Sequence, residues 1–351
     1  MKRFQTAAAL VAGLLCAWPA IAEPCENPNA LGTARTIAID PAKLGRIGSM
    51  QYHQTLALAP KEIVLTFDDG PILPMTSKVL EALRAECVKA TFFVIGRHAR
   101  AHPEAVQQMA RDGHTVANHT ENHHLFTMGE ALGIKEFEMG FASIAAALAP
   151  VNAVPAPFIR FPGLFNSAGV EAYAKRKNLA VMSADLTADD WLPISGEHVF
   201  QRAIGRLGLK GSGVLLLHDA EARTAQMLPK LLNELKTRGY RVVHLVPAPG
   251  TDPEIPSGPL VAEALAKPVA PIRHVVRVRA DTKLDATNNY APAEASSNYA
   301  TSVASKTAPA PAAMAAAAKA SSQPEGAMFG RWRKMVQEGR SAALTPASRP
   351  D

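Results

Sequence analysis

Cysteine is scarce in this chain of 351 residues, and its positive and negative charges are nearly balanced. Only Cys25 and Cys87 lie beyond the first 22 residues, and two cysteines are too few for a zinc site built from cysteine ligands. The formal net charge is +6, from 37 basic and 31 acidic residues, and the basic residues form no stripe with interleaved aromatic side chains. These features exclude a nucleic-acid partner and leave at most a weak attraction to acidic cell-wall or membrane surfaces.

The hydrophobic run near the N-terminus is short. It covers residues 7–17, which is too short to span a bilayer, and it follows the basic residues Lys2 and Arg3. The small-x-small sequence Ala20-Ile21-Ala22 comes next and is typical of signal-peptide cleavage. We therefore expect residues 1–22 to be a removable signal peptide and the mature protein to be periplasmic or secreted.

Export affects whether the two remaining cysteines are expected to be oxidised or free. In an oxidising compartment, Cys25 and Cys87 can form one disulfide. The alternative is a pair of free thiols, with Cys87 buried beside a strand predicted at 89–95. The sequence favours neither alternative over the other.

Between residues 61 and 246, apolar β-branched segments alternate with stretches that are compatible with helices. The predicted strands are 62–67, 89–95, 114–117, 158–161, 179–184, 213–217 and 240–245. The predicted helices are 76–86, 98–111, 130–148, 167–177, 197–207 and 221–238. This alternation predicts parallel strands, and seven of them favour a closed or nearly closed barrel, with an open doubly wound sheet as the alternative. Dinucleotide binding is disfavoured because Asp68-Asp69-Gly70-Pro71 stands where a glycine-rich phosphate loop would follow the first strand.

The two ends of the chain differ from this regular middle. Residues 23–60 form an N-terminal lead-in segment with an extra strand expected at 36–39. Residues 247–351 form a tail rich in proline and alanine that we expect to be largely disordered, because it cannot bury enough apolar area. A short amphipathic helix is expected at 327–340. Its apolar stripe would make weak contact with a membrane or cell-wall surface, or it is local amphipathicity without a partner.

Two motifs place reactive side chains where strands end. The buried strand 62–67 runs into Asp68 and Asp69, and a Gly-Pro turn signal follows. Adjacent residues leaving a strand point in different directions, so one carboxylate can bind a metal while the other stays free as a base. Further along, His119 and His123 are four residues apart, which we interpret as one side of a helical turn. Together the motifs predict an Asp-His-His metal site beside a spare carboxylate, an arrangement that indicates a hydrolase.

Five motifs occur in one order along the middle of the chain. They are Thr66-Phe67-Asp68-Asp69-Gly70, His119-Thr120-Glu121-Asn122-His123, Arg160-Phe161-Pro162-Gly163, Asp190-Trp191 and Leu216-Leu217-His218-Asp219. With these motifs the chain resembles the polysaccharide deacetylases of the NodB-homology type, carbohydrate esterase family four. The resemblance covers residues 61–246. It implies an α/β fold, a distorted (β/α)7 barrel, which agrees with the alternation of segments.

The resemblance implies a role for each motif. It makes three residues the ligands of one divalent metal: Asp69, His119 and His123. It assigns the general base to Asp68 and the general acid to His218. It also implies that Arg160 pairs with Asp68, and that Asp190 in turn braces Arg160. Such support fixes the orientation of the groups that react.

The resemblance also implies which residues border the site. The backbone near Gly163 would help to bind the oxyanion, although the aromatic residue that the family often has before this glycine is missing. Trp191 and Leu216 would border the acetyl methyl group, or they are ordinary core residues. Asp219 either orients His218 or caps the following helix, and the cap is favoured. His124 is an alternative third ligand, and the roles of Asp185 and Asp189 stay open.

The resemblance implies an exported, metal-dependent hydrolase that removes N-acetyl groups from GlcNAc units of peptidoglycan or a chitin-like oligosaccharide. The metal would be zinc first, with cobalt, manganese or nickel also suited to mixed nitrogen and oxygen ligands. Four alternatives remain: an O-acetyl-glycan esterase of the same fold, a hydrolase of non-sugar amides, a non-catalytic glycan-binding protein, and an iron site for oxygen chemistry. The spare carboxylate of Asp68 argues for hydrolysis over the iron site.

Overall fold

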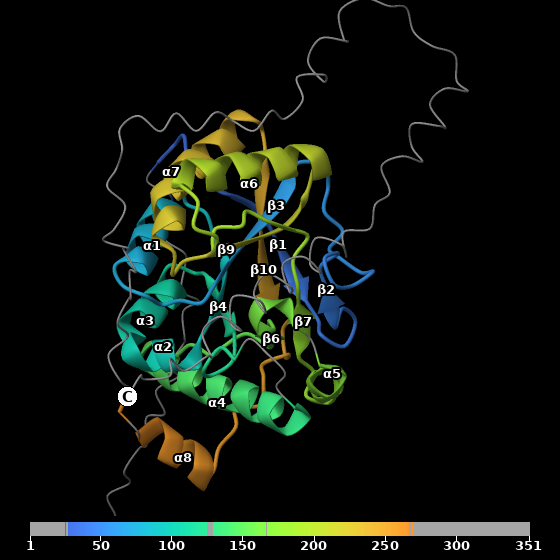
Figure 1. Ribbon diagram of the computed structural model, residues 1–351, viewed down its shortest axis with the longest axis vertical. Helices are drawn as coiled ribbons and strands as arrows, with labels where there is room; N and C mark the ends of the chain where they lie inside the picture. Colours follow the sequence, from blue (N-terminus) through green and yellow to red (C-terminus); the bar gives the residue numbers. More distant parts are fainter. Residues whose placement is uncertain (1–24, 26, 125–128, 166, 267, 270–351) are drawn as a thin grey trace, which may run out of the picture. The chain divides into compact units, whose positions relative to one another are not determined.

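The computed structural model describes residues 25, 27–124, 129–165, 167–266 and 268–269 (Figure 1). The expected signal peptide, the tail beyond residue 269 and its helix at 327–340 lie outside these residues. The predicted domain boundaries therefore stay predictions. Within the described residues, no helix combines the length and the hydrophobicity that a bilayer crossing requires.

The central feature is a ring of parallel strands. Its members, in the order in which they lie side by side, are β3 (Glu62–Asp68), β4 (Thr91–Val94), β5 (Thr115–Asn118), β6 (Phe158–Ile159), β7 (Ala180–Met182), β8 (Leu186–Thr187) and β9 (Gly213–His218). β8 follows β7 after three residues and pairs with β9, which pairs with β3 from Ile63 to Asp68. The strands therefore run round from β3 to β9 and back to β3, with no backbone pairing between β7 and β8 among the described residues, and this incomplete closure agrees with the predicted distorted barrel.

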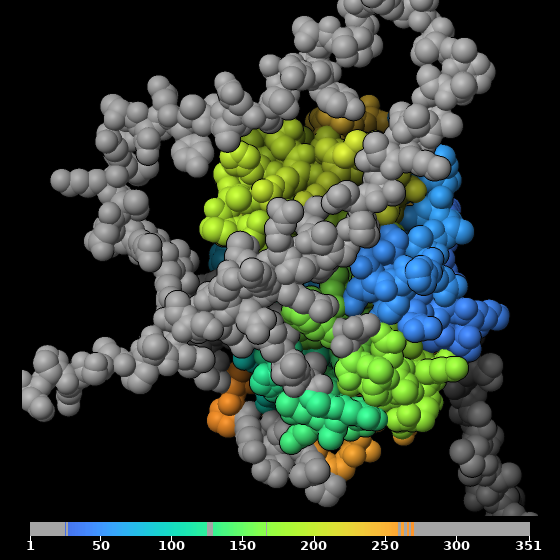
Figure 2. All heavy atoms as spheres, turned by 45° about the vertical axis from the view of Figure 1, so that its right-hand side comes forward, coloured from blue at the N-terminus to red at the C-terminus, as the bar shows by residue number. Residues whose placement is uncertain are grey.

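Three further strands extend the ring. β10 (Arg241–Pro247) pairs with the start of β3, and β1 (Thr33–Ile39) runs parallel to β10 along most of its length. The extra strand expected at 36–39 is thus confirmed and is longer than predicted. β2 (Arg46–Ile47) pairs with β7. Figure 2 shows this N-terminal segment, in blue, on the surface beside the yellow-green region that contains α5 (Ala168–Arg176).

The helices follow the predicted alternation with two exceptions, a break within 98–111 and a helix at 259–266 in the tail that we expected to be largely disordered. Besides α5 they are α1 (Met75–Ala85), α2 (Gly96–Ala101), α3 (Pro103–Arg111), α4 (Glu130–Leu148), α6 (Gly196–Lys210), α7 (Ala222–Thr237) and α8 (Pro259–Ala266), with 3-10 turns at Ala149–Val151 and Pro162–Leu164. The single helix predicted at 98–111 is wrong, because the chain breaks at His102 before Pro103. Proline lacks an N–H and restricts the residue before it, so Pro103 begins a new helix instead of continuing α2.

Side chains alternate between the two faces of the barrel wall. Along β3, Ile63, Leu65 and Phe67 belong to the large cluster that contains residues of α1, α6 and α7, whereas Val64 belongs to a second cluster with residues of β4, β5 and β9. Successive residues of a strand point to opposite faces. Thr66 and Asp68 therefore share the inner face with Val64, and on β9 His218 shares it with Val214 and Leu216. The pattern directs polar groups at the strand ends into the barrel.

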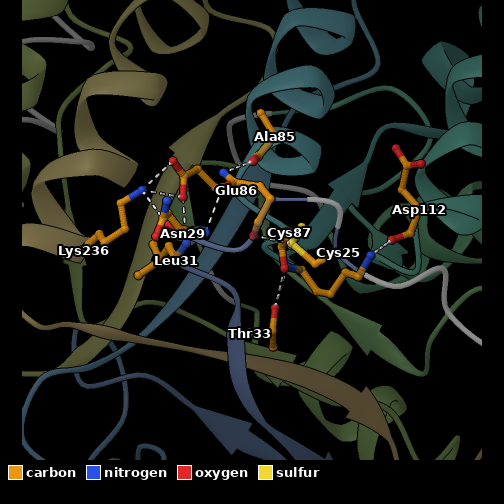
Figure 3. Close-up of a disulfide and its surroundings, with 11 residues drawn as sticks. Cys25, Asn29, Leu31, Thr33, Ala85, Glu86, Cys87, Asp112 and Lys236 are labelled. Carbon is orange, nitrogen blue, oxygen red and sulfur yellow. Dashed lines mark hydrogen bonds and ion pairs between the residues drawn. A yellow bond between two sulfur atoms is a disulfide. The ribbon is translucent and has the colours of Figure 1, made fainter.

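A disulfide ties the N-terminal segment to the loop after α1 (Figure 3). It joins Cys25 to Cys87, whose Cα atoms are 5.8 Å apart. Hydrogen bonds reinforce the junction: Leu31 N donates to Glu86 Oε2 at 2.7 Å, and Lys236 Nζ donates to Glu86 Oε1 at 2.9 Å. Of the two alternatives left open by the sequence, the structure therefore has the disulfide and not the two free thiols.

We expect the Cys25→Ser, Cys87→Ser double variant to lose about 2–4 kcal/mol of unfolding free energy, because the unfolded chain is no longer closed into a long loop. The two cysteines are 62 residues apart in the sequence. Denaturant unfolding of the mature protein measures the loss. Reductant should lower the wild-type midpoint to that of the double variant and leave the variant unchanged. A wild-type midpoint that does not respond to reductant would contradict the prediction.

Candidate active site

Two neighbouring carboxylates at the end of β3 face different surroundings. Asp68 is the last residue of the strand and is 2% exposed. Asp69 follows it with a left-handed backbone, at a φ of 76°, which turns its side chain away from the strand direction. The side chain of Asp69 is 27% exposed. The expected divergence of the two carboxylates is therefore a consequence of this single left-handed residue.

The structure brings Asp69 together with the two histidines of the second motif. Asp69 Oδ1 lies 3.0 Å from His123 Nε2 and 3.4 Å from His119 Nε2. The ligand atoms of the three residues all lie within 4.8 Å of one another. His119 Nδ1 lies 2.8 Å from the carbonyl oxygen of Arg160, so this ring nitrogen carries the proton and Nε2 is left with its lone pair.

The two histidines do not lie on a helical turn, so that interpretation of their spacing is wrong. Thr120 and His123 both have positive φ, at 71° and 57°. Side chains supply the hydrogen bonds that a helix would make through its backbone. Thr120 N donates to Asn118 Oδ1 at 2.8 Å, and His123 N donates to Thr120 Oγ1 at 3.0 Å. Such local side-chain bonds compete with helix formation.

The donors of this cluster fit a divalent cation. Asp69 Oδ1 is buried, and within the described residues it has no hydrogen bond of good geometry despite the two imidazoles beside it. Burial opposes ionisation of Asp69, but the imidazoles of His123 and His119 outweigh it and hold the pKa of Asp69 well below its ordinary value. Two imidazole nitrogens and one carboxylate oxygen are a ligand set that leaves positions open for other groups.

His124 lies outside this cluster. Its side chain is 51% exposed, and Nε2 lies 3.4 Å from Glu136 Oε1 on α4. Glu136 also accepts hydrogen bonds from the backbone and side-chain nitrogens of Asn122, at 2.8 and 2.9 Å. The geometry therefore favours His123 over His124 as the partner of His119.

Arg160 is fully buried and joins three strands. Its Nη1 donates to Asp68 Oδ1 at 2.6 Å and to Thr66 Oγ1 at 2.9 Å. Nε and Nη2 donate to the carbonyl oxygens of Met182 and Ser183 at 3.0 and 2.9 Å. The guanidinium also lies 4.0 Å from the ring centroid of Phe93. The expected contact between Arg160 and Asp68 is confirmed.

Asp190 contacts His218 and not Arg160, so the predicted brace is wrong. Its Oδ1 lies 2.8 Å from His218 Nδ1, and its Oδ2 accepts from His218 N at 2.7 Å and from Thr224 Oγ1 at 2.6 Å. Arg160 donates instead to two carbonyl oxygens, a hydroxyl and Asp68. Burial alone would lower the pKa of His218, but the carboxylate of Asp190 outweighs it and raises that pKa to about 10.

Sequence reasoning missed two residues that hold the backbone after Asp69. His98 Nδ1 lies 2.7 Å from the carbonyl oxygen of Asp69. Asp219 Oδ1 accepts from Gly70 N at 3.1 Å, so the predicted roles of Asp219 as a helix cap or as the partner of His218 are both wrong. Burial raises the pKa of Asp219 to about 7. The position of Asp219 beside His218 was a usable signal, whereas nothing in the sequence marked His98.

The predicted walls lie around His218 and the turn after β6. The ring of Trp191 is edge-on to His218, with centroids 5.6 Å apart, and its buried Nε1 has no hydrogen-bond partner among the described residues. Leu216 is 4% exposed and precedes His218 by two residues on the same strand face. Gly163 has a φ of 58°, which glycine adopts without steric cost.

Within the described residues, Asp185 and Asp189 join elements of the fold and do not contact the ligand cluster. Asp185 accepts from Ser49 N at 2.9 Å and from Val214 N at 2.9 Å, which joins the N-terminal segment to β9. Asp189 pairs with Arg206 at 2.7 Å and also with Arg202 on the same helix, α6. Of the aspartates around the fourth motif, Asp190 is therefore the one that reaches the site.

We expect Arg160→Ala to lower the free energy of unfolding by about 3–5 kcal/mol, because it leaves the buried carboxylate of Asp68 without its cation. Arg160→Lys should recover only part of this loss, since an ammonium group cannot reproduce the planar fork of donors. Denaturant unfolding measures both.

The matched control is Lys177→Ala, which removes an exposed ion pair with Glu254 at 2.7 Å. It should leave the free energy of unfolding nearly unchanged, because solvent screens an exposed pair. A similar effect of Lys177→Ala and Arg160→Ala would show that the buried pair does not hold the site together.

Comparison with known proteins identifies related sequences. Residues 56–182 match the sequence family described as Polysaccharide deacetylase. A peptidoglycan-N-acetylglucosamine deacetylase of Bacillus cereus is 31% identical over 189 residues, which cover 52% of this chain and 66% of that protein. A second protein of the same description and organism is 31% identical over 188 residues, 52% of this chain and 85% of that protein. A chitooligosaccharide deacetylase of Rhizobium leguminosarum is 32% identical, over 45% of this chain and 72% of that protein.

The similarity extends to a solved structure. A peptidoglycan deacetylase of Bdellovibrio bacteriovorus superimposes with a TM-score of 0.56 and 31% identity, covering 62% of this chain and 60% of that one. Coverage of the relatives is uneven. The chain spans 66% of the first Bacillus cereus protein and 40% of a peptidoglycan-N-acetylmuramic acid deacetylase of Bacillus subtilis.

Proposed function

The chain belongs to the polysaccharide deacetylase family, and from this premise we propose that it hydrolyses N-acetyl groups on GlcNAc units of peptidoglycan or a chitin-like glycan. One observation carries the proposal. A ligand set of Asp69, His119 and His123 lies at the end of the barrel beside a carboxylate, Asp68, that it does not use. His218 Nε2 lies 4.0 Å from Asp69 Oδ2, within reach of the same reacting group.

The three ligand residues would hold one divalent cation, with zinc as the first choice and cobalt, manganese or nickel as substitutes. The unsatisfied Oδ1 of Asp69, the Nε2 of His119, whose Nδ1 is held by a carbonyl, and the nearness of the His123 imidazole support this. When bound, such a cation polarises the amide carbonyl and lowers the pKa of water, both of which amide hydrolysis needs.

Asp68 would act as the general base. Its Oδ1 is held by Arg160 Nη1, so Oδ2, which lies 3.8 Å from His119 Nε2, is the oxygen that accepts the proton of the attacking water. Arg160 keeps Oδ1 occupied and leaves Oδ2 available, because its Nε and Nη2 are bound to the carbonyl oxygens of Met182 and Ser183. The backbone near Gly163 would stabilise the charge that develops on the carbonyl oxygen.

His218 would act as the general acid. Its Nδ1–H is held by Asp190 Oδ1, so Nε2 delivers the proton to the departing amine, and acetate and a glucosamine unit result. The raised pKa of His218 keeps the imidazole protonated before the reaction. Trp191 and Leu216 would border the acetyl methyl group, since both lie next to His218.

Cell-wall glycans lie outside the cytoplasm, so the expected signal peptide at 1–22 agrees with this substrate class. We place the mature protein in the periplasm or outside the cell. The presence of a base, an acid and three ligands argues against a purely glycan-binding role.

Acetate release from purified mature protein tests the reaction. Asp68→Asn and His218→Gln should each lower kcat by about 10²–10⁴-fold, because each removes one proton-transfer group. Substrates are peptidoglycan, chitooligosaccharides and acetylated xylan. Release from xylan alone would indicate an O-acetyl esterase, and glycan binding without any release would indicate a binding protein.

Metal content tests the ligand set independently of turnover. His119→Ala and His123→Ala should lose bound zinc in equilibrium binding to the apoprotein, because each removes a ligand nitrogen. His124→Ala is the matched control, since its side chain is 51% exposed and lies against Glu136. It should keep both zinc and activity. Loss of zinc in His124→Ala with retention in His123→Ala would overturn the assignment.

A further inference from the structure

A single peptide unit, the one that links Asp69 to Gly70, is held at both of its polar groups. Its carbonyl oxygen is bound by His98, and its N–H is bound by Asp219. We propose that His98 and Asp219 are positioning residues that clamp this peptide and thereby aim the carboxylate of Asp69 at the metal. The inference rests on the proposed metal site and adds two residues to it.

His98 holds the carbonyl side of the clamp. It lies on α2, is 5% exposed, and its Nδ1 is 2.7 Å from the carbonyl oxygen of Asp69. Arg97 Nε donates to His98 Nε2 at 3.3 Å. Because Nε2 accepts that bond, Nδ1 carries the ring proton and donates it to Asp69. The adjacent loop is tied to α2 as well, since Ile95 N donates to the carbonyl oxygen of Gly70 at 3.1 Å.

Asp219 holds the N–H side. It follows β9, is 1% exposed, and its Oδ1 accepts from Gly70 N at 3.1 Å. Its Oδ2 accepts from Thr76 Oγ1 on α1 at 2.6 Å, which fixes the orientation of the carboxylate. A Cβ atom at position 70 would lie 1.9 Å from Asp219 Oδ2. Glycine at position 70 is therefore what allows Asp219 to approach the peptide.

The clamp matters because Asp69 has a left-handed backbone, which is unfavourable for a residue with a side chain. Rotation about the N–Cα bond of Asp69 would relieve that strain, and it would move the Asp69 carboxylate and the Asp69–Gly70 peptide together, away from His119 and His123. Binding both polar groups of the peptide from separate elements, α2 and the loop after β9, prevents the rotation. Neither positioning residue belongs to the ligand cluster itself.

Competition between the apoprotein and a chromophoric chelator for Zn²⁺ tests the clamp without substrate. His98→Leu and Asp219→Ala should each bind Zn²⁺ about 10–100-fold more weakly, the usual effect of losing support behind a ligand. His98→Asn should restore most of the affinity, because its amide nitrogen takes the place of Nδ1 as donor. Asp219→Asn should likewise exceed Asp219→Ala, since it keeps an acceptor oxygen for Gly70 N.

His114→Leu is the matched control. His114 is another buried histidine, 7% exposed, but it precedes β5 at the opposite end of the strand from His119. This variant should lose stability and keep its Zn²⁺ affinity. Equal weakening in His114→Leu, or equal affinities for His98→Asn and His98→Leu, would overturn the clamp.

The two proposals fail in different ways. If the wild-type apoprotein binds no Zn²⁺, the metal site itself is wrong. If wild-type binding is tight and His98→Leu and Asp219→Ala both match it, the clamp alone is wrong. The comparison of His98→Leu with wild type and with His98→Asn stands even where Asp219→Ala does not fold.

Discussion

The buried ion pair between Arg160 and Asp68 is the contact on which the rest of the site depends. A guanidinium with no exposure is tolerated only if its donors are bound and its charge is balanced, and Arg160 meets both conditions through Asp68, Thr66 and two strand carbonyls. These bonds join β3, β6 and the segment after β7 across the inside of the barrel. The carbonyl oxygen of Arg160 accepts a hydrogen bond from Nδ1 of His119. One residue thus orients the proposed base and a proposed ligand together.

Two neighbouring carboxylates acquire different chemistry from their backbone geometry. Asp68 ends a regular strand and points inward to Arg160, whereas Asp69 turns away with a positive φ toward the imidazoles. His98 and Asp219 hold the peptide that follows. The loop after β3 therefore accounts for the different roles proposed for the two residues, base and ligand, since their side chains are chemically identical.

The sequence was sufficient to predict the features that local patterns determine. Apolar, β-branched segments marked all seven predicted strands, and the motifs marked Asp69, His119 and His123, which the fold brings together. Contacts between distant segments were harder to predict. Asp190 contacts His218, and Arg160 contacts the carbonyl oxygens of Met182 and Ser183, which the spacing of the motifs does not indicate. The four-residue spacing of His119 and His123 also failed to predict the turn at 119–123, because hydrogen bonds to the side chains of Asn118 and Thr120 replace those of a helix.

The distribution of charge explains why Asp69 is the place for a cation. Asp68 has the permanent charge of Arg160, and Asp190 has the imidazole of His218. Asp219 contacts neutral donors among the described residues, and burial accordingly favours its protonated form. Asp69 faces the imidazoles of His119 and His123, which must be neutral to serve as ligands. Its buried Oδ1 then has no cationic partner among the described residues, and a divalent cation bound there would balance its charge.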